Sequence, residues 1–498
     1  MTTASTRYGT VSGSRLAGGI TRFLGIPYAA SPTGLLRFAA PQPPAAWDGV
    51  RECTAFGATP PKPAYQPPFD TILPEPDIGG DDWLSLNVWT RAMAGSAPVM
   101  VWIHGGAFSN GNSAIPMYDG EAFARDGVVF VSINYRLGVD GFAYLPDAAA
   151  PANRGLLDQV AALEWVRDNI AAFGGDPSQV TIVGESAGAM SVSTLLGMPR
   201  AQGLFRRVIA QSGSAQFGAD PADATLVTGE LGKVLGFEAT AASLAGLDLD
   251  KLMTAQAAVR DAMAAAPDPA RFGATVVPTS MAFLPVIDGD VLPVHPLAAL
   301  AAGVGADVAL LTGTNAEEFR LFLVPSGAAA FVTDESLPGF LGALGIPADI
   351  AALYQANRPA AAAGDVLCAL MTDVFFRNPM LAAARARAAA GGPAPTYLYE
   401  FAWQSPVQSI GAGHAMEIPF VFDNLTAADA ESAIGSEPPA ALAADMHAVW
   451  VRFAATGDPG WQPFDHSYPV MTFWATADGH AELVPDPRGD ERASWPQS

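Results

Sequence analysis

The stretch that says most about this fold is Gln179-Val180-Thr181-Ile182-Val183-Gly184-Glu185-Ser186-Ala187-Gly188-Ala189-Met190. The β-branched residues before Gly184 predict a buried strand, and the apolar residues after Gly188 predict a helix. Glycines on both sides of Ser186 allow a turn tight enough to lift the serine side chain clear of a sheet, as a G-x-S-x-G nucleophile requires. The alternative interpretation is a plain turn with structural glycines, so the motif needs support from the rest of the chain.

Short Val- and Ile-rich runs alternate with longer Ala- and Leu-rich runs along the chain, which predicts an α/β fold with a mostly parallel central sheet and helices on both faces. One long helix is expected over 156–173, because apolar residues recur there at steps of three and four until Gly174. The expected strands are 84–89, 99–103, 128–134, 179–183, 207–211, 308–311 and 396–401.

The remaining segments are read as additions to this sheet. The proline-rich segment 60–76 predicts an irregular surface loop, because proline cannot supply interior sheet hydrogen bonds. Alanine-rich helical insertions are expected over 223–264 and 338–387, and a last helix over 440–456. Since no Gly/Ser linker or charge block divides the chain, residues 1–498 are expected to form one domain.

Charge and cysteine content restrict the partners and the location. A formal charge of −23 repels phosphate backbones and anionic lipids, so nucleic acid and membrane are not expected as partners. Its two cysteines, Cys53 and Cys368, show no metal-type spacing, and no disulfide framework is expected. The first residues lack the apolar core of a signal peptide, and apolar runs such as 98–103 are too short for a membrane span, so a cytoplasmic location is expected.

A second motif supports the nucleophile. The apolar strand before His104 ends in the loop Gly105-Gly106-Ala107-Phe108, whose small residues can expose backbone N–H groups. Such groups stabilise the oxyanion of a tetrahedral intermediate, and Gly106, Ala107 and Ala187 are the expected donors. An ordinary strand-to-loop turn is the alternative, but both motifs occur in the order that an acyl-transfer site requires.

A serine nucleophile needs a base, and the chain has six histidines: His104, His295, His414, His447, His466 and His480. His414 is the preferred candidate because it lies in a Gly-Ala-Gly-His loop that allows close approach, although an ordinary loop histidine is an equal alternative by position alone.

The triad's acid should follow a strand between Ser186 and the histidine. Glu317 and Glu318 compete for this role after the strand 308–311. Asp288 is a rival, but Asp-Gly after an apolar run is usually a turn.

These motifs together resemble the type B carboxylesterases, the para-nitrobenzyl esterase and cholinesterase branch of the α/β-hydrolase fold. The resemblance spans nearly the whole chain. It is carried by the segments Phe23 to Ala29, Trp47 to Val50, Asp82 to Val88, Phe173 to Pro177, Gly184 to Gly188, Gln211 to Ser214 and His414 to Phe422.

The resemblance implies Ser186 as nucleophile, Glu318 as acid and His414 as base, with Gly106, Ala107 and Ala187 as the oxyanion hole. Glu318 is preferred to Glu317 because the family's acid is the second of two acidic residues. No metal or organic cofactor is implied. A base of this kind would lose activity on acidification through a pKa of about 6 to 7.

The chain also departs from the family. A disulfide found in many relatives would join positions at or near Pro60 and Trp83, where this chain has no cysteine, in agreement with a reducing cytoplasm. Phe319 stands where a glycine is common, which makes it a candidate pocket wall. Glu185, beside the nucleophile, either biases the charge of the histidine or is simply a buried, hydrogen-bonded carboxylate.

The expected function is hydrolysis of small to medium, largely apolar carboxylic esters through an acyl-enzyme on Ser186, by a monomer or homodimer. Carbamate or amide cleavage, a lipase, and a binding module without activity are the alternatives. The Gly-Gly-Ala loop resembles the type found in esterases that accept bulky, even tertiary, alcohols. The residues expected to line an apolar gorge are Tyr65, Phe69, Phe108, Phe319 and Phe322.

Overall fold

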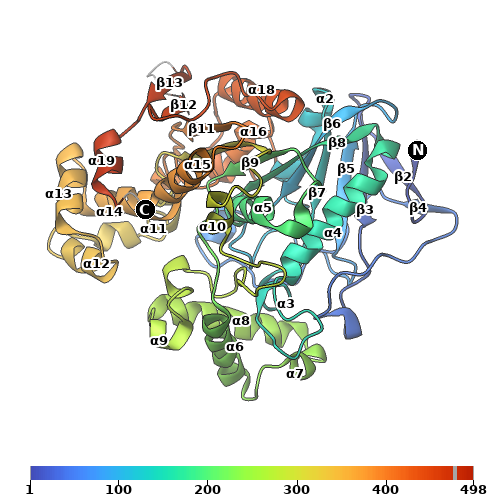
Figure 1. Ribbon diagram of the computed structural model, residues 1–498, viewed down its shortest axis with the longest axis horizontal. Coiled ribbons are helices and arrows are strands. Elements are labelled where there is room, and N and C mark those ends of the chain that lie inside the picture. Colours follow the sequence, from blue (N-terminus) through green and yellow to red (C-terminus); the bar gives the residue numbers. More distant parts are fainter. Residues whose placement is uncertain (1, 475–478, 497–498) are drawn as a thin grey trace.

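A 13-stranded sheet runs through the part of the chain that the computed structural model describes, residues 2–474 and 479–496. Its strand order is β1-β2-β3-β5-β7-β6-β8-β9-β10-β11-β12-β13, with β4 paired to β2, and helices lie on both of its sides (Figure 1). Neighbouring strands are parallel from β7 through β12 and antiparallel toward both edges. This arrangement confirms the expected α/β-hydrolase fold.

The strands are β1 (Thr2–Ser5), β2 (Thr10–Arg15), β3 (Thr21–Pro27), β4 (Val50–Glu52), β5 (Ser85–Thr90), β6 (Ala97–Ile103), β7 (Val129–Ile133), β8 (Gly175–Glu185), β9 (Arg207–Gln211), β10 (Ala309–Asn315), β11 (Thr396–Phe401), β12 (Pro469–Phe473) and β13 (Glu482–Pro485). All seven strands expected from the sequence correspond to β5 through β11. The strands toward the edges of the sheet, β1 to β4, β12 and β13, were not expected.

The α-helices are α1 (Phe69–Ile72), α2 (Glu121–Arg125), α3 (Gly138–Phe142), α4 (Arg154–Asn169), α5 (Ala187–Gly197), α6 (Pro221–Leu235), α7 (Ala241–Ala245), α8 (Leu249–Ala265), α9 (Pro269–Phe272), α10 (Pro296–Ala301), α11 (Arg320–Leu323), α12 (Leu337–Ala343), α13 (Ala348–Asn357), α14 (Ala363–Thr372), α15 (Asn378–Ala390), α16 (Ile418–Val421), α17 (Glu431–Ile434), α18 (Ala440–Thr456) and α19 (Gly489–Ser494). The expected long helix is α4 with a 3-10 turn to Phe173, and the helix expected over 440–456 is α18. The helix α18 is not the last one, because α19 follows it. The helix α19 is short and polar, so no regular spacing of apolar residues in the sequence predicts it.

The central strands are apolar on both faces because helices cover both. In β6, Val99, Val101 and Ile103 join the core beneath α4 and α5. The intervening Met100 and Trp102 join a second core with residues of α16 and α18. Side chains alternate across a strand, so one short run supplies both layers. The rigid sheet that results positions the loops at the carboxyl ends of its strands, where ligands bind in folds of this kind.

The helical run 363–390 joins α14 and α15 through a π-helical turn, Asp373–Arg377. It has the length and the mean hydropathy, 1.3 over its most apolar stretch, of a membrane span, and 67% of that stretch is buried inside the protein. Such burial is typical of the core helix of a globular protein. The sequence expectation that no apolar run reaches this length was therefore wrong for this helix.

Candidate active site

Ser186 stands at the junction between β8 and α5. Its backbone has φ 56° and ψ −124°, a region that residues with a side chain rarely adopt. The flanking glycines make this turn possible, because a Cβ at Gly184 would lie 2.3 Å from backbone atoms and one at Gly188 would lie 2.0 Å from a backbone oxygen. The strand-turn-helix expected from the sequence is present, and Ser186 opens into a cavity.

His414 lies against Glu318. The carboxylate Oε2 of Glu318 accepts a hydrogen bond from Nδ1 of His414 at 2.7 Å, and its Oε1 accepts one from the backbone N–H of Asn315 at 2.7 Å. Glu317 instead accepts a hydrogen bond from the backbone N–H of Ala412. The structure therefore pairs Glu318 with the histidine and gives Glu317 a role in holding the histidine loop.

The other ring nitrogen of His414 faces Glu185. Nε2 lies 3.1 Å from Oε1 of Glu185, which has no partner with hydrogen-bond geometry among the described residues. Both side chains are buried, His414 at 5% and Glu185 at 3% exposure. Of the two interpretations of Glu185, this contact favours the one in which it biases the charge of the histidine.

These contacts shift both pKa values. Burial lowers the pKa of His414, but the negative charges of Glu185, Glu318 and Glu417 outweigh burial and raise it to about 9. Burial raises the pKa of Glu185 to about 8, against the opposing charge of His414. The two groups titrate as a coupled pair. The pKa of the base is therefore higher than the value of about 6 to 7 expected from the sequence.

A third buried glutamate, Glu417, connects the acid and histidine loops. Its carboxylate accepts hydrogen bonds from Nδ2 of Asn315 at 2.6 Å and from Nε2 of Gln211 at 3.0 Å. Oε1 of Gln211 in turn accepts one from Nε1 of Trp450 at 2.9 Å. Burial raises the pKa of Glu417. This network fixes the end of β10 relative to the loop that carries the histidine.

The loop after β6 has the backbone that an oxyanion site requires. Gly106 has φ 107° and Ala107 has φ 53°, and both line the cavity beside Ser186. Ala187 is the first residue of α5, where backbone N–H groups lack intrahelical acceptors. In the described part of the chain, no hydrogen bond from the N–H groups of these three residues is present.

Phe108 does not line the cavity, contrary to the sequence expectation. It is fully buried and packs against Phe142 with ring centroids 4.8 Å apart. The positive φ values of Ala107 and Phe108 turn the chain, so that the phenyl ring enters the core.

Glu75, from the proline-rich loop, anchors the oxyanion loop. Its carboxylate accepts hydrogen bonds from the backbone N–H of Gly111 and from Nδ2 of Asn110. Nδ2 of Asn110 also donates to the carbonyl of Pro63, and the carbonyl of Gly106 accepts from the N–H of Asn110. Nothing in the sequence distinguished Glu75 from other loop carboxylates, so its role was missed.

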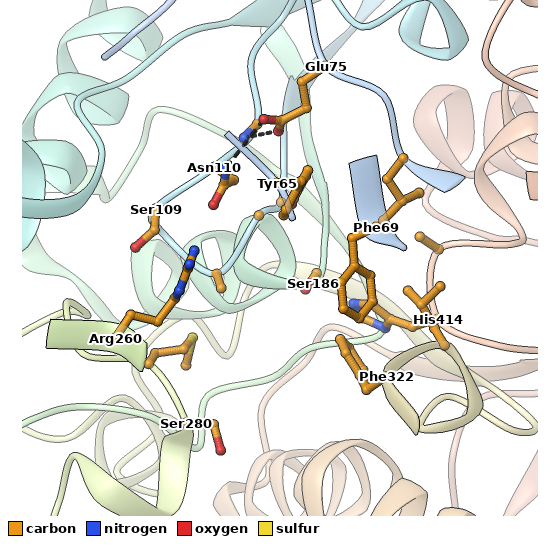
Figure 2. Close-up of a pocket in the computed structure, with 18 of the residues that line it drawn as sticks. Tyr65, Phe69, Glu75, Ser109, Asn110, Ser186, Arg260, Ser280, Phe322 and His414 are labelled. Atoms are coloured by element: carbon orange, nitrogen blue, oxygen red, sulfur yellow. Dashed lines mark hydrogen bonds between the residues drawn. The ribbon is translucent and has the colours of Figure 1, made fainter. Parts of the chain in front are cut away.

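The cavity at Ser186 has a volume of about 730 Å³, within the range of small-molecule sites. Tyr65, Phe69, Phe319 and Phe322 line it, as expected. Figure 2 shows Ser186 with Phe69, Phe322 and His414 on one side and Arg260 on the other.

Two further aromatic residues of the cavity were missed. Phe375 and Phe376 come from the π-helical turn, and the ring of Phe376 lies 4.8 Å from the imidazole of His414. The ring of Phe322 lies 5.3 Å from the same imidazole. These rings keep water from the histidine and account for its burial.

The remaining candidates have structural roles. Nδ1 of His104 donates to the carbonyl of Gly105, and burial lowers the pKa of His104 to about 4. His295 caps α10, and Nδ1 of His447 donates to the carbonyl of Val421. Asp288 accepts hydrogen bonds from the N–H groups of Asp290 and Leu292, as a turn residue does.

Cys53 and Cys368 are buried and unpaired. Across residues 2–474 and 479–496, no group of three His, Cys, Asp or Glu side chains is arranged to hold a metal ion.

Comparisons with known proteins agree with this geometry. The model of the carboxylesterase family matches residues 1–484. The chain is 38% identical to the para-nitrobenzyl esterase of Bacillus subtilis (strain 168) over 91% of this chain and 90% of that protein. It is 33% identical to the phenmedipham hydrolase of Pseudarthrobacter oxydans over 97% of this chain and 94% of that protein.

A solved carboxylesterase of Geobacillus stearothermophilus superposes with a TM-score of 0.85 at 37% identity, with 100% of both chains covered. The chain therefore belongs to the carboxylesterase family, as a type B carboxylesterase of the α/β-hydrolase fold that hydrolyses carboxylic esters.

Proposed function

We propose that Ser186, His414 and Glu318 carry out this hydrolysis by two-step acyl transfer. Ser186 Oγ attacks the ester carbonyl while Nε2 of His414 takes its proton, and His414 then gives that proton to the leaving alcohol. Water, activated by the same histidine, releases the acid and restores Ser186. The observation that carries the proposal is the 2.7 Å contact between His414 and Glu318 at the wall of the cavity into which Ser186 opens.

The contact between His414 and Glu185 fits a resting state. A protonated imidazole faces Glu185 at Nε2, and deprotonation frees this nitrogen to accept the proton of Ser186. Glu318 holds Nδ1 and stabilises the imidazolium that forms in each step. The N–H groups of Gly106, Ala107 and Ala187 receive the oxyanion, and the anchored turn keeps them in place before substrate arrives.

The preferred substrates are small to medium esters with apolar portions. Support comes from the aromatic side chains around Ser186 and from a volume that fits molecules of this size. The chain backbone at Gly106 and Ala107 presents no bulky side chain to the alcohol half, so esters of tertiary alcohols are accepted. Hydrolysis of tertiary-butyl acetate beside ethyl acetate tests this point, and an intact tertiary-butyl ester contradicts it.

The decisive experiment compares the parent with Ser186→Ala on para-nitrophenyl acetate, butyrate and octanoate at neutral pH. We expect kcat/KM to fall by about 10⁴-fold or more in the variant, with short chains preferred by the parent. Ser178→Ala is the matched control, because Ser178 lies at the exposed start of the same strand, β8. A parent without activity, or a Ser186→Ala variant that keeps its rate, contradicts the proposal.

We also propose that the protein works in a reducing compartment such as the cytoplasm, as a monomer or homodimer. Two buried, unpaired cysteines support the first statement. Cell fractionation tests the location, and sedimentation analysis tests the assembly.

A further inference from the structure

One wall of the cavity is formed by α8, and two hydrogen-bond donors stand on it. Gln256 and Arg260 both line the cavity. They are four residues apart on a helix, so they lie one above the other on the same face, about 6 Å apart. Neither of them is part of the triad or of the oxyanion loop.

Gln256 is a buried donor without an acceptor. It is 2% exposed, and its Oε1 accepts a hydrogen bond from the backbone N–H of Val139 at 2.9 Å. That bond fixes the orientation of the amide, so the NH₂ group is the end left over. Nε2 has no hydrogen-bond partner among the residues that the structure describes. A buried donor in this state costs free energy unless a ligand or water satisfies it.

The amide of Gln256 is also held tightly in place. A Cβ at Gly138 would lie 2.0 Å from Oε1 of Gln256, so the backbone there approaches the amide as closely as only glycine allows. Nε2 would lie 2.3 Å from the same Cβ, so the whole amide packs against the backbone of α3 and forms a rigid wall beside Arg260.

The guanidinium of Arg260 has hydrogen-bond donors that no described residue uses. Its Nε and Nη2 contact one oxygen of Asp261, at 3.0 Å and 2.9 Å. The Asp261 side chain is 66% exposed, so water weakens this pair. No described residue bonds to Nη1 of Arg260, and no other Lys or Arg is among the described residues that line the cavity. Apart from His414, Arg260 is thus the one basic side chain among the described residues that line the cavity.

The position of Arg260 indicates which half of an ester would reach it. In Figure 2, Arg260 and His414 lie on opposite sides of Ser186. Since His414 protonates the leaving alcohol, the alcohol half must lie on the histidine side. The acyl half then extends toward α8.

We propose that Arg260, beside Gln256 on α8, binds a carboxylate at the far end of the acyl chain, so that the enzyme accepts half-esters of dicarboxylic acids. The carboxylate accepts from Nη1 of Arg260. This inference rests on the proposed function, because it assigns the acyl half from the role of His414.

The test uses pairs of esters that differ only in charge. Monoethyl succinate, adipate and suberate are each compared with the ethyl ester in which an isopropyl group replaces the carboxylate. Titration of the released acid gives kcat/KM for each. For at least one chain length, we expect Arg260→Gln to lower the anionic-to-neutral ratio of kcat/KM about tenfold. Arg260→Lys should recover part of it, because lysine keeps the charge but not the planar fork.

Two controls make the result specific. Arg167→Gln removes an arginine that is also paired with the next residue, Asp168, but lies outside the cavity. An equal change of the ratio in Arg167→Gln would overturn the subsite in favour of a general charge effect. The second control is 4-acetoxybenzoate against 4-isopropylphenyl acetate, which carries the charge on the alcohol half. A response to Arg260→Gln in this pair alone would overturn the assignment to the acyl half, as would an unchanged ratio at every chain length.

A binding measurement separates this proposal from the proposed function. If the parent cleaves neither member of any pair, the proposed function fails. Calorimetric binding of monoethyl adipate to Ser186→Ala and to Ser186→Ala/Arg260→Gln then decides the subsite without any turnover. Binding about tenfold weaker in the double variant supports it, and equal affinity overturns it.

Discussion

Glu185→Gln should move the pH dependence of activity downward. In the parent, the negative charge of Glu185 lies 3.1 Å from Nε2 of His414 and favours the protonated imidazole. Only the neutral imidazole can act as a base, so activity rises with pH through the apparent pKa of the pair. Because the pKa of His414 is raised to about 9 and that of Glu185 to about 8, we expect the midpoint of the parent above pH 7.

The size of the shift follows from the distance. Two unit charges 3.1 Å apart interact by about 5 kcal/mol at an effective dielectric constant of about 20, which corresponds to about four pKa units. In fully water-like surroundings the same pair gives about one unit. Glu185 is itself partly protonated near neutral pH, which weakens its effect on His414. The midpoint of the pH profile should therefore move down by an amount nearer the lower of these two values, one pKa unit or somewhat more.

The assay is kcat/KM for para-nitrophenyl butyrate between pH 5 and 10, with released product measured against standards at each pH. Glu164→Gln is the control. Glu164 is exposed on α4, so this substitution removes the same formal charge far from the site. The reasoning is refuted if the midpoint of Glu185→Gln equals that of the parent or lies above it. A shift of the same size in Glu164→Gln would also refute it, since the effect would then not depend on the contact with His414.

Three further changes test other parts of the site. Glu318→Gln should lower kcat by about 10⁴-fold with little change of KM, because the imidazolium loses its stabilising carboxylate. Steady-state kinetics measure both constants, and a fall of kcat of less than tenfold would contradict this role. Glu75→Ala should lower kcat about 10- to 100-fold and raise KM by less than this, because the oxyanion loop loses its anchor. Glu75→Gln should recover part of kcat. A rise of KM without a loss of kcat would indicate a substrate contact instead. Trp450→Phe should lower the free energy of unfolding in urea by about 1 to 2 kcal/mol more than Trp83→Phe does, since only the former leaves a buried acceptor, Oε1 of Gln211, without its donor. Equal losses would contradict that reasoning.

The central sheet could be predicted because its strands are apolar on both faces. The run that became β6 is continuous in apolar residues, and the buried second half of β8 carries Val180, Ile182 and Val183, which is the pattern of a strand buried between helices. Strands β1 and β2 lack this pattern, since Thr, Ser and Arg dominate them, and their antiparallel pairing at the edge exposes part of each strand. Such strands become recognisable only once the neighbouring strand is known.

The site residues divide in the same way. Ser186, Glu318 and His414 stood out because fixed motifs surround them, and the structure brings Glu318 and His414 together. Their catalytic roles, and the single domain expected for residues 1–498, stay predictions. Phe108 was wrongly placed because a positive φ reverses the direction of a side chain, and composition does not report φ.

Phe376, Arg260 and Glu75 were missed for a different reason. Each comes from a segment far from the motifs in sequence, and only the folded chain brings it to the cavity. The raised pKa of His414 was missed as well, because it depends on three glutamates that converge in space.

The π-helical turn in the run 363–390 has a consequence for how this helix tolerates change. On the α14 side, Val366, Leu367 and Leu370 face a core formed with α12 and α13. On the α15 side, Met380, Leu381 and Ala384 face a separate core with β11 and β12. The turn offsets the angular phase of the two halves, so each half meets its own core. Loss of one residue between them would rotate one half against the other by about 100°, and the helix would fail by misalignment rather than by shortening.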